Sequence, residues 1–170
     1  MNLAWRLLEI GNVHYAGGVY ALARAAYEEG LGYFRGLDYA YGIACASNNL
    51  GMACFHLGDP VRAQALHREA LALYASYESA EGIVWSLERL GVAAARHGDP
   101  RRAARLLGAS SAARAELGQA LSGWQSSDFQ QATAALQEAL GSEAWEAAWQ
   151  EGGAMSREEA IAFALGEAGA

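Results

Sequence analysis

The fold is decided by two stretches of eleven residues that nearly repeat each other. Residues 50–60 read LGMACFHLGDP, and residues 90–100 read LGVAAARHGDP. A third stretch, residues 10–20, reads IGNVHYAGGVY and keeps the first glycine and a later glycine at the same places. The three stretches start 40 residues apart and align without a gap. Repetition at a fixed spacing of this size predicts an array of stacked structural repeats.

Each repeat is predicted to contain two helices joined by a tight turn. In the triplet Gly58-Asp59-Pro60, glycine favours the left-handed end of one helix, aspartate caps the next helix, and proline suits its first position. The glycine in the middle of the first helix, Gly51 in the second repeat, is unfavourable there by about 1 kcal/mol relative to alanine. Its recurrence therefore indicates close contact between the two helices. We expect helices at 3–16, 19–35, 39–57, 60–76, 79–97, 100–117, 128–140, 143–151 and 157–168.

Composition supports an all-helical globular chain. The 170 residues are 53% hydrophobic and 18% charged, with 39 alanines and two prolines. This apolar content excludes intrinsic disorder, and no apolar run reaches the ~18 residues of a membrane span. The net charge of −7 argues against nucleic-acid binding. Cys45 and Cys54 are predicted to be buried thiols in a reducing cytoplasm, because their spacing along one helix prevents a disulfide between them.

When the three repeats are aligned, the residues at equivalent positions, here called columns, resemble the tetratricopeptide repeat. Its Leu-Gly pair is matched by Ile10-Gly11, Leu50-Gly51 and Leu90-Gly91, and its second-helix alanine by Ala23, Ala63 and Ala103. Its bulky column is matched by Tyr27, His67 and Leu107, and its next small column by Gly30, Ala70 and Ser110. Two features depart from the usual pattern. The repeats are six residues longer than the usual 34, and Arg35, Ala75 and Ala115 replace the closing proline. Longer variants of this kind are similar to those of kinesin light chains and bacterial regulators.

The resemblance implies a right-handed α-solenoid. Three repeats would occupy residues 1–118, divided at about 1–37, 38–77 and 78–118, and residues 119–170 would form a linker and C-terminal capping helices. The linker is expected at residues 118–127, where the last repeat ends and the C-terminal part begins. Trp145 and Trp149 are expected to seal the last repeat, because a solenoid needs closed ends. An aromatic ligand box is the alternative for these two tryptophans.

The C-terminal third also resembles the tail of LuxR-type and AfsR-type bacterial transcriptional regulators. The resemblance rests on residues 106–109, 114–118, 139–141, 147–152 and 155–160. It implies a protein–protein interaction scaffold, the sensor or scaffold part of a transcriptional or signalling regulator. The alternative is a small-molecule sensor domain that holds an effector in its concave groove.

The family resemblance also implies which residues would line that groove. The first helix of each repeat would contribute Trp5, Leu8, Asn12, Tyr15 and Ala16, then Cys45, Asn48, Met52, Phe55 and His56, then Trp85, Glu88, Val92, Ala95 and Arg96. The set contains Asn12 and Asn48 but no lysine, so it lacks the combination of lysines and asparagines that clamps a C-terminal carboxylate in chaperone-binding relatives. Some of the aromatic residues would, in the alternative interpretation, only fill the contact between adjacent helices. The expected partner is a protein or peptide, with no nucleic acid or membrane bound by this region.

No pattern of catalytic, cofactor-binding or metal-ligating residues is found, so we expect no enzyme, no cofactor and no metal site. The histidines are scattered, and His67 occupies a packed column. The acidic pairs Glu28-Glu29 and Glu158-Glu159 suit solvated helix positions. Arg96, Arg101, Arg102 and Arg105 form the one basic cluster, interpreted as solvated or helix-capping residues, with an anion site as the alternative.

The first helix is rich in apolar residues, among them Leu3, Trp5, Leu7 and Leu8, with no polar cap before them. Large exposed apolar patches are uncommon on monomers. We therefore expect either upstream repeats to cover this face or two chains to form a homodimer through their N-terminal helices or the groove.

Overall fold

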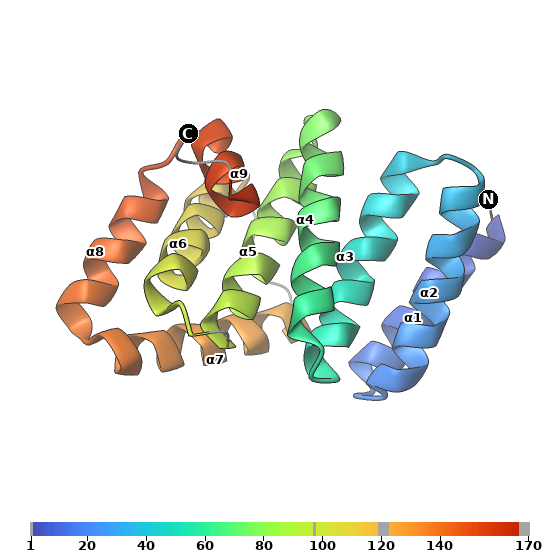
Figure 1. Cartoon of the computed structure of the whole chain (residues 1–170), viewed down its shortest axis with the longest axis horizontal. Coiled ribbons are helices and arrows are strands. Elements are labelled where there is room, and N and C mark those ends of the chain that lie inside the picture. Colours follow the sequence, from blue (N-terminus) through green and yellow to red (C-terminus); the bar gives the residue numbers. More distant parts are fainter. Residues whose placement is uncertain (1, 97, 119–122, 167–170) are drawn as a thin grey trace. The chain divides into compact units, whose positions relative to one another are not determined.

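The computed structural model describes residues 2–96, 98–118 and 123–166, and these residues form helices and turns without a strand (Figure 1). The helices are α1 (Asn2–Ala16), α2 (Tyr20–Gly36), α3 (Ala40–His56), α4 (Pro60–Ser76), α5 (Ala80–Arg96), α6 (Pro100–Glu116), α7 (Gly123–Leu140), α8 (Ser142–Gly153) and α9 (Arg157–Leu165). The prediction of an all-helical fold is confirmed. None of the described helices is both long enough and apolar enough to span a bilayer.

The predicted helix boundaries agree with the structure to within a few residues, with one larger difference. Helix α7 begins at Gly123, so the second half of the linker expected at 118–127 is helical. Residues 119–122 of that linker, residue 97, and residues 167–168 of the helix expected at 157–168 lie outside the described part of the chain. The serines and glycine at 122–127 are weak helix formers, which is why the sequence pattern indicated a linker there.

The chain divides into two compact units, Met1–Tyr77 and Glu78–Ala170. The first unit contains α1 to α4, the two predicted N-terminal repeats. In it, α1 packs against α2, α2 against α3, and α3 against α4. The second unit contains the third repeat, α5 and α6, together with α7, α8 and α9.

The turns between the two helices of a repeat have the geometry that the Gly-Asp-Pro triplet predicts. Gly58 and Gly98 have φ of +79° and +84°, in the left-handed region. The Asp59 side chain accepts a hydrogen bond from the Arg62 backbone N–H at 3.2 Å. Pro60 then opens helix α4. Asp99 does the same for α6, accepting from the Arg102 backbone N–H at 3.0 Å.

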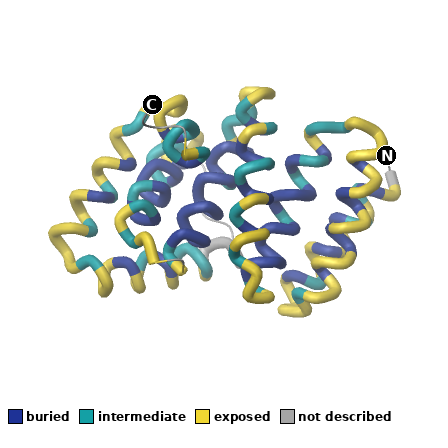
Figure 2. Tube along the Cα trace, viewed as in Figure 1, coloured by how far each residue is buried: buried dark blue, intermediate teal, exposed yellow. Residues whose placement is uncertain are grey.

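The glycine column marks close contact between paired helices, as predicted. A Cβ added at Gly51 would lie 2.5 Å from Cε1 of the buried His67 side chain. In the second unit, a Cβ at Gly91 would lie 2.7 Å from Cδ2 of Leu107. The alanine column faces the same contact, and Ala63 is fully buried. Figure 2 shows the result in α3 and α5, which are buried along most of their length.

The second unit is closed by α8, but not through its tryptophans. A Cβ at Gly152 of α8 would collide with the Arg105 carbonyl oxygen of α6, and one at Gly108 of α6 with the Trp149 carbonyl oxygen. Both helix backbones therefore approach closely across Gly108, Ala148 and Gly152. The expectation that Trp145 and Trp149 seal the last repeat is wrong, because small residues occupy that contact and the two indoles remain half-exposed.

Candidate functional site

In the first unit, the residues expected to face a partner lie on α1 and α3. The structure divides them by burial. Leu8, Tyr15, Asn48, Met52 and Phe55 are buried. Trp5, Cys45 and His56 are half-buried, whereas Asn12 and Ala16 are exposed. The residues that a partner of this unit can reach are therefore these last five.

Trp5 belongs to an aromatic cluster at the N-terminal ends of α1 and α3. Its ring lies edge-on to Phe34, with centroids 4.9 Å apart, and to Tyr39 at 6.3 Å. Tyr41 extends the cluster to Tyr74 of α4, at 6.2 Å. Edge-to-face pairs of this kind hold rings in fixed orientations. Trp5 thus presents a rigid, half-exposed apolar surface.

A second aromatic cluster lies at the C-terminal ends of the same two helices. The His56 ring stacks on Tyr20, with centroids 4.3 Å apart and planes 6° from parallel. Tyr15 lies edge-on to His56 at 5.5 Å, and so does Phe55 at 5.3 Å. His56 is therefore fixed by packing on a helix end that remains partly accessible to a partner.

Between the two clusters lies a polar contact centred on Asn12. Its side-chain oxygen accepts hydrogen bonds from Tyr27 Oη at 2.8 Å and from Asn49 Nδ2 at 3.2 Å. The bond to Asn49 joins α1 to α3. With the oxygen occupied, the Asn12 side chain is oriented by its own unit, and its NH₂ group supplies two donors.

The two cysteines are poor candidates for nucleophiles. Burial raises the pKa of the Cys45 thiol, although a hydrogen bond from Tyr74 partly opposes this effect. Burial also raises the pKa of Cys54. Reactive cysteines have a lowered pKa, since the thiolate is the attacking form. Among the described residues, no group of three or more His, Cys, Asp or Glu side chains could hold a metal ion.

In the second unit, the expected partner-facing residues lie on α5 and differ in accessibility. Trp85 and Ala95 are half-buried and Arg96 is exposed, but Val92 and Glu88 are buried. Glu88 forms an ion pair with Arg114 of α6, and these side chains are only 5% and 8% exposed. A buried carboxylate bonded to a neighbouring helix is held by the fold, so Glu88 is engaged within its own unit.

Burial also raises the pKa of Glu88. Desolvation raises its pKa above the ordinary value of 4.5, and the attraction of Arg114 and Arg89 only partly opposes this effect. Asp128 of α7 raises the pKa further. The sequence pattern did not indicate this pair, because Glu88 and Arg114 lie on different helices and their columns hold Leu8 and Phe34 in the first repeat.

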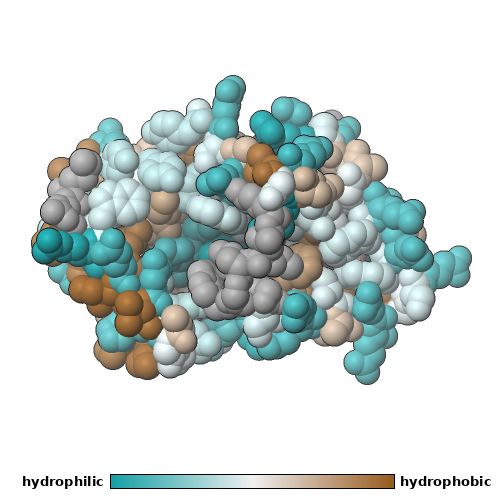
Figure 3. All heavy atoms as spheres, turned by 180° about the vertical axis from the view of Figure 1, so that it is seen from behind, coloured by the Kyte–Doolittle hydropathy of each residue, from teal (hydrophilic) through white to brown (hydrophobic). Residues whose placement is uncertain are grey.

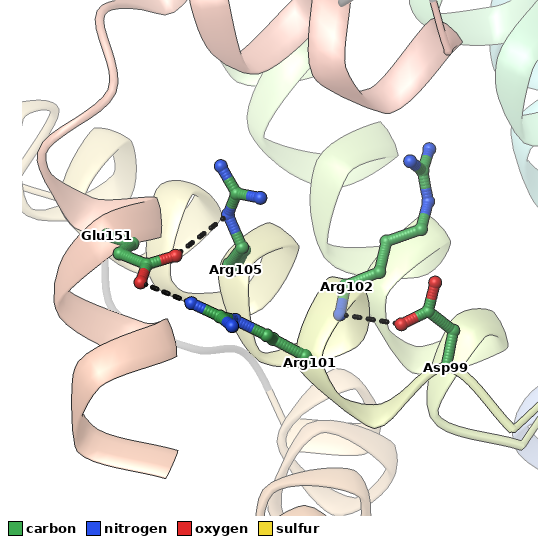
Figure 4. Close-up of polar contacts among 5 residues, drawn as sticks. All are labelled: Asp99, Arg101, Arg102, Arg105 and Glu151. Carbon is green, nitrogen blue, oxygen red and sulfur yellow. Dashed lines mark hydrogen bonds and ion pairs between the residues drawn. The ribbon is translucent and has the colours of Figure 1, made fainter. Parts of the chain in front are cut away.

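The arginine cluster holds α6 to the C-terminal helices (Figure 4). Arg101 and Arg105 approach the Glu151 carboxylate of α8 at 2.7 and 3.4 Å. The Arg102 guanidinium donates to the carbonyl oxygens of Phe163 and Ala164 at the end of α9, at 2.9 and 3.0 Å. A cation near helix C-terminal carbonyls is favourable. These three arginines thus have structural roles that sequence spacing alone did not reveal.

The comparisons with known proteins agree with the repeat geometry. The tetratricopeptide-repeat family matches residues 42–116, which begin near the start of α3 and end with α6. Searches of curated proteins and of solved structures found no match. Tetratricopeptide repeats are a non-catalytic helical fold that generally mediates protein–protein interaction. Residues 42–116 therefore carry repeats of the tetratricopeptide type, and the hairpin of α1 and α2 extends the same 40-residue pattern toward the N-terminus.

Proposed function

We propose that this chain is a protein-interaction module that binds a protein or peptide through the first helices of its repeats. The observation that carries the proposal is the repeat match over residues 42–116, joined to the half-exposed aromatic residues fixed on α1 and α3. Aromatic side chains held in one orientation lose little entropy on binding and are frequent at interface centres. The net charge of −7 favours a protein over a nucleic acid as partner.

We further propose a regulatory role, in which the chain is the sensor or scaffold part of a transcriptional or signalling regulator. The resemblance of the C-terminal third to the tails of LuxR-type and AfsR-type regulators supports this role. The unpaired thiols of Cys45 and Cys54 fit a cytoplasmic location. The complete reading frame tests the role. A DNA-binding or nucleotide-binding domain in the same frame supports it, whereas a membrane anchor or secretion signal contradicts it.

Site-specific photocross-linking tests the interaction surface. A photoreactive residue at Ala16, which is exposed at the end of α1, should cross-link to a partner in the producing cells. The matched control is Ala72, an exposed alanine on α4 in the same unit. Neither substitution removes a packed side chain. Specific adducts at Ala16 and none at Ala72 are expected, and equal labelling at both positions would contradict the proposal.

The alternative function, a small-molecule sensor, makes a different prediction in the same cells. The Ala16 probe would give no protein adduct. Native mass spectrometry of the gently purified chain would instead show a bound molecule of constant mass, lost when Trp5 is replaced by alanine.

The exposed face of α1 supports a homodimer. Ile10 and Val13 are 49% and 72% exposed, although Leu50 and Ala53, at the equivalent positions of α3, are buried. In Figure 3, hydrophobic atoms gather on the first unit, at the lower left of the view. We propose that a second copy covers this face in a two-fold arrangement. Trp145 and Trp149 would remain outside the contact.

Sedimentation velocity at high micromolar concentration tests the dimer. Ile10→Lys with Val13→Lys should give a monomer from a dimeric wild type. Val61→Lys is the matched control, because Val61 is 77% exposed on α4 of the same unit. Leu8 is unsuitable for this test, since it is buried against Gly30 and its replacement would disturb the fold. A monomeric wild type would contradict the dimer.

A further inference from the structure

Helices α7 and α8 enclose an open hollow in the second unit that has no role in the repeat packing described above. Its volume is about 630 Å³, and its lining residues are Thr133, Gln137, Ser142, Trp145, Glu146 and Trp149. The first two come from α7 and the others from α8. The hollow belongs to the second unit, whereas α1 and α3 belong to the first unit, so the two sites share no residue.

Helix α8 packs against α6 through one face and lines the hollow with another. Ala148 and Gly152 are buried, and Glu151 on the same side is paired with arginines of α6. The adjoining face carries Trp145 and Trp149 one turn apart, and both side chains line the hollow. Small residues make the contact with α6, so the two indoles are not needed to fill it. Two half-buried tryptophans that line a hollow open to solvent indicate a binding surface.

The aromatic rings of the hollow are held in place by one another. The Trp145 and Trp149 centroids lie 5.0 Å apart, with planes inclined by 40°. Phe129 of α7 lies edge-on to Trp149, at 6.2 Å. This arrangement leaves ring area accessible from the hollow. The faces of tryptophan rings are negative and attract cations.

The charge of this region favours the same ligand. Residues 119–156 contain five acidic residues and no arginine, lysine or histidine. Glu146 lines the hollow beside Trp145, and its side chain is exposed. It has no ion-pair partner among the described residues. A carboxylate next to tryptophan rings, without a competing cation on either helix, is complementary to a guanidinium or ammonium group.

We propose that the hollow between α7 and α8 binds an arginine or lysine side chain of a basic peptide segment. Gln137 and Glu146 are exposed at the hollow, so it is open to solvent on one side. Sites for free small molecules usually bury most of the ligand. This open hollow would leave much of a small molecule exposed to solvent. It can accept one long side chain of a peptide while the peptide backbone remains outside. In this arrangement the cation lies against the Trp145 and Trp149 rings, and Glu146 accepts its hydrogen bonds.

Titration of the full chain with a short peptide containing two arginines tests the proposal. The comparison peptide carries citrulline, which has nearly the same shape as arginine but no charge. Indole N–H resonances of Trp145 and Trp149, assigned by single Trp→Phe variants, should shift with the arginine peptide only. Equal shifts with the citrulline peptide, or no shift with either, would overturn the proposal.

Variants locate the binding and distinguish it from general attraction by an acidic protein. Trp145→Leu and Glu146→Gln should each weaken binding of the arginine peptide about fivefold. Glu138→Gln removes the same charge from an exposed position of α7 outside the hollow and should leave the affinity unchanged. Equal effects of Glu138→Gln and Glu146→Gln would overturn the site. Tetramethylammonium binding as tightly as the peptide would overturn the assignment to a peptide side chain.

Discussion

Single residues decide how closely the helices of a repeat approach. Gly51 and Gly32 are both helical glycines in the first unit, but their surroundings differ. A Cβ at Gly51 would press on the His67 ring, whereas nothing lies within 4 Å of one at Gly32. The glycine that recurs in the 40-residue pattern is thus the one that the packing requires. Its role was predictable from the sequence because an unfavourable residue recurs at one column.

Replacement of these glycines by alanine should change stability in opposite directions. Gly51→Ala should destabilise the fold by about 1–3 kcal/mol through overpacking against His67. Gly32→Ala should stabilise it by up to about 1 kcal/mol, because alanine favours the helix and nothing opposes its methyl group. Denaturant titration measures both. Equal losses in the two variants would contradict the packing described for α3 and α4.

Paired helices illustrate what the sequence pattern could not predict. The helix pairs of the repeats were predictable from the Gly-Asp-Pro turns and from the recurring glycine and alanine positions. These features concern helices that follow each other directly in the sequence. The Glu88–Arg114 pair depends on which side chains meet across α5 and α6, and one sequence does not specify this. The same holds for Arg102, which caps α9 from 61 and 62 residues away. The positions of Trp145 and Trp149 were predicted wrongly because a bulky residue was expected at a contact that glycine and alanine make.

The Glu88–Arg114 pair can be compared with its counterpart in the first repeat, where Leu8 and Phe34 occupy the two columns and are buried. Either Glu88→Leu or Arg114→Phe alone should destabilise the fold by about 3–5 kcal/mol, because one buried charge is left unpaired. The double variant should recover most of this loss, since apolar groups can replace a buried ion pair. A double-mutant cycle in denaturant measures the coupling. Additive losses would contradict the pairing.

The raised pKa of Glu88 predicts that the free energy of unfolding depends on pH through the contact between α5 and α6. Because the folded chain binds this proton more tightly than the unfolded chain, Glu88 stabilises the fold most below its ordinary pKa of 4.5. This contribution is lost as the pH rises through the raised, folded-state pKa. The unfolding free energy of the wild type minus that of Glu88→Gln should therefore fall as the pH increases from below 4.5. A difference that rises over this range would contradict the assignment.

At the scale of the whole molecule, the sequence predicted an all-helical repeat chain because the pattern recurs three times. It predicted the surface less well. The residues expected on the first helices include buried ones, such as Met52 and Phe55, because a column position specifies a helix face but not how far neighbouring side chains cover it. The accessible residues of α1 and α3 are therefore the part of that prediction on which the proposed function rests.

Amide hydrogen exchange with the partner identified by cross-linking at Ala16 tests the central claim most directly. Binding through the first helices of the repeats predicts that, within the first unit, the partner slows exchange mainly in α1 and α3. Exchange in the outer turns of α4 around Ala72 should stay unchanged. Slower exchange confined to α2 and α4, with α1 and α3 unaffected, would contradict the claim that this chain binds its partner through the first helices of its repeats.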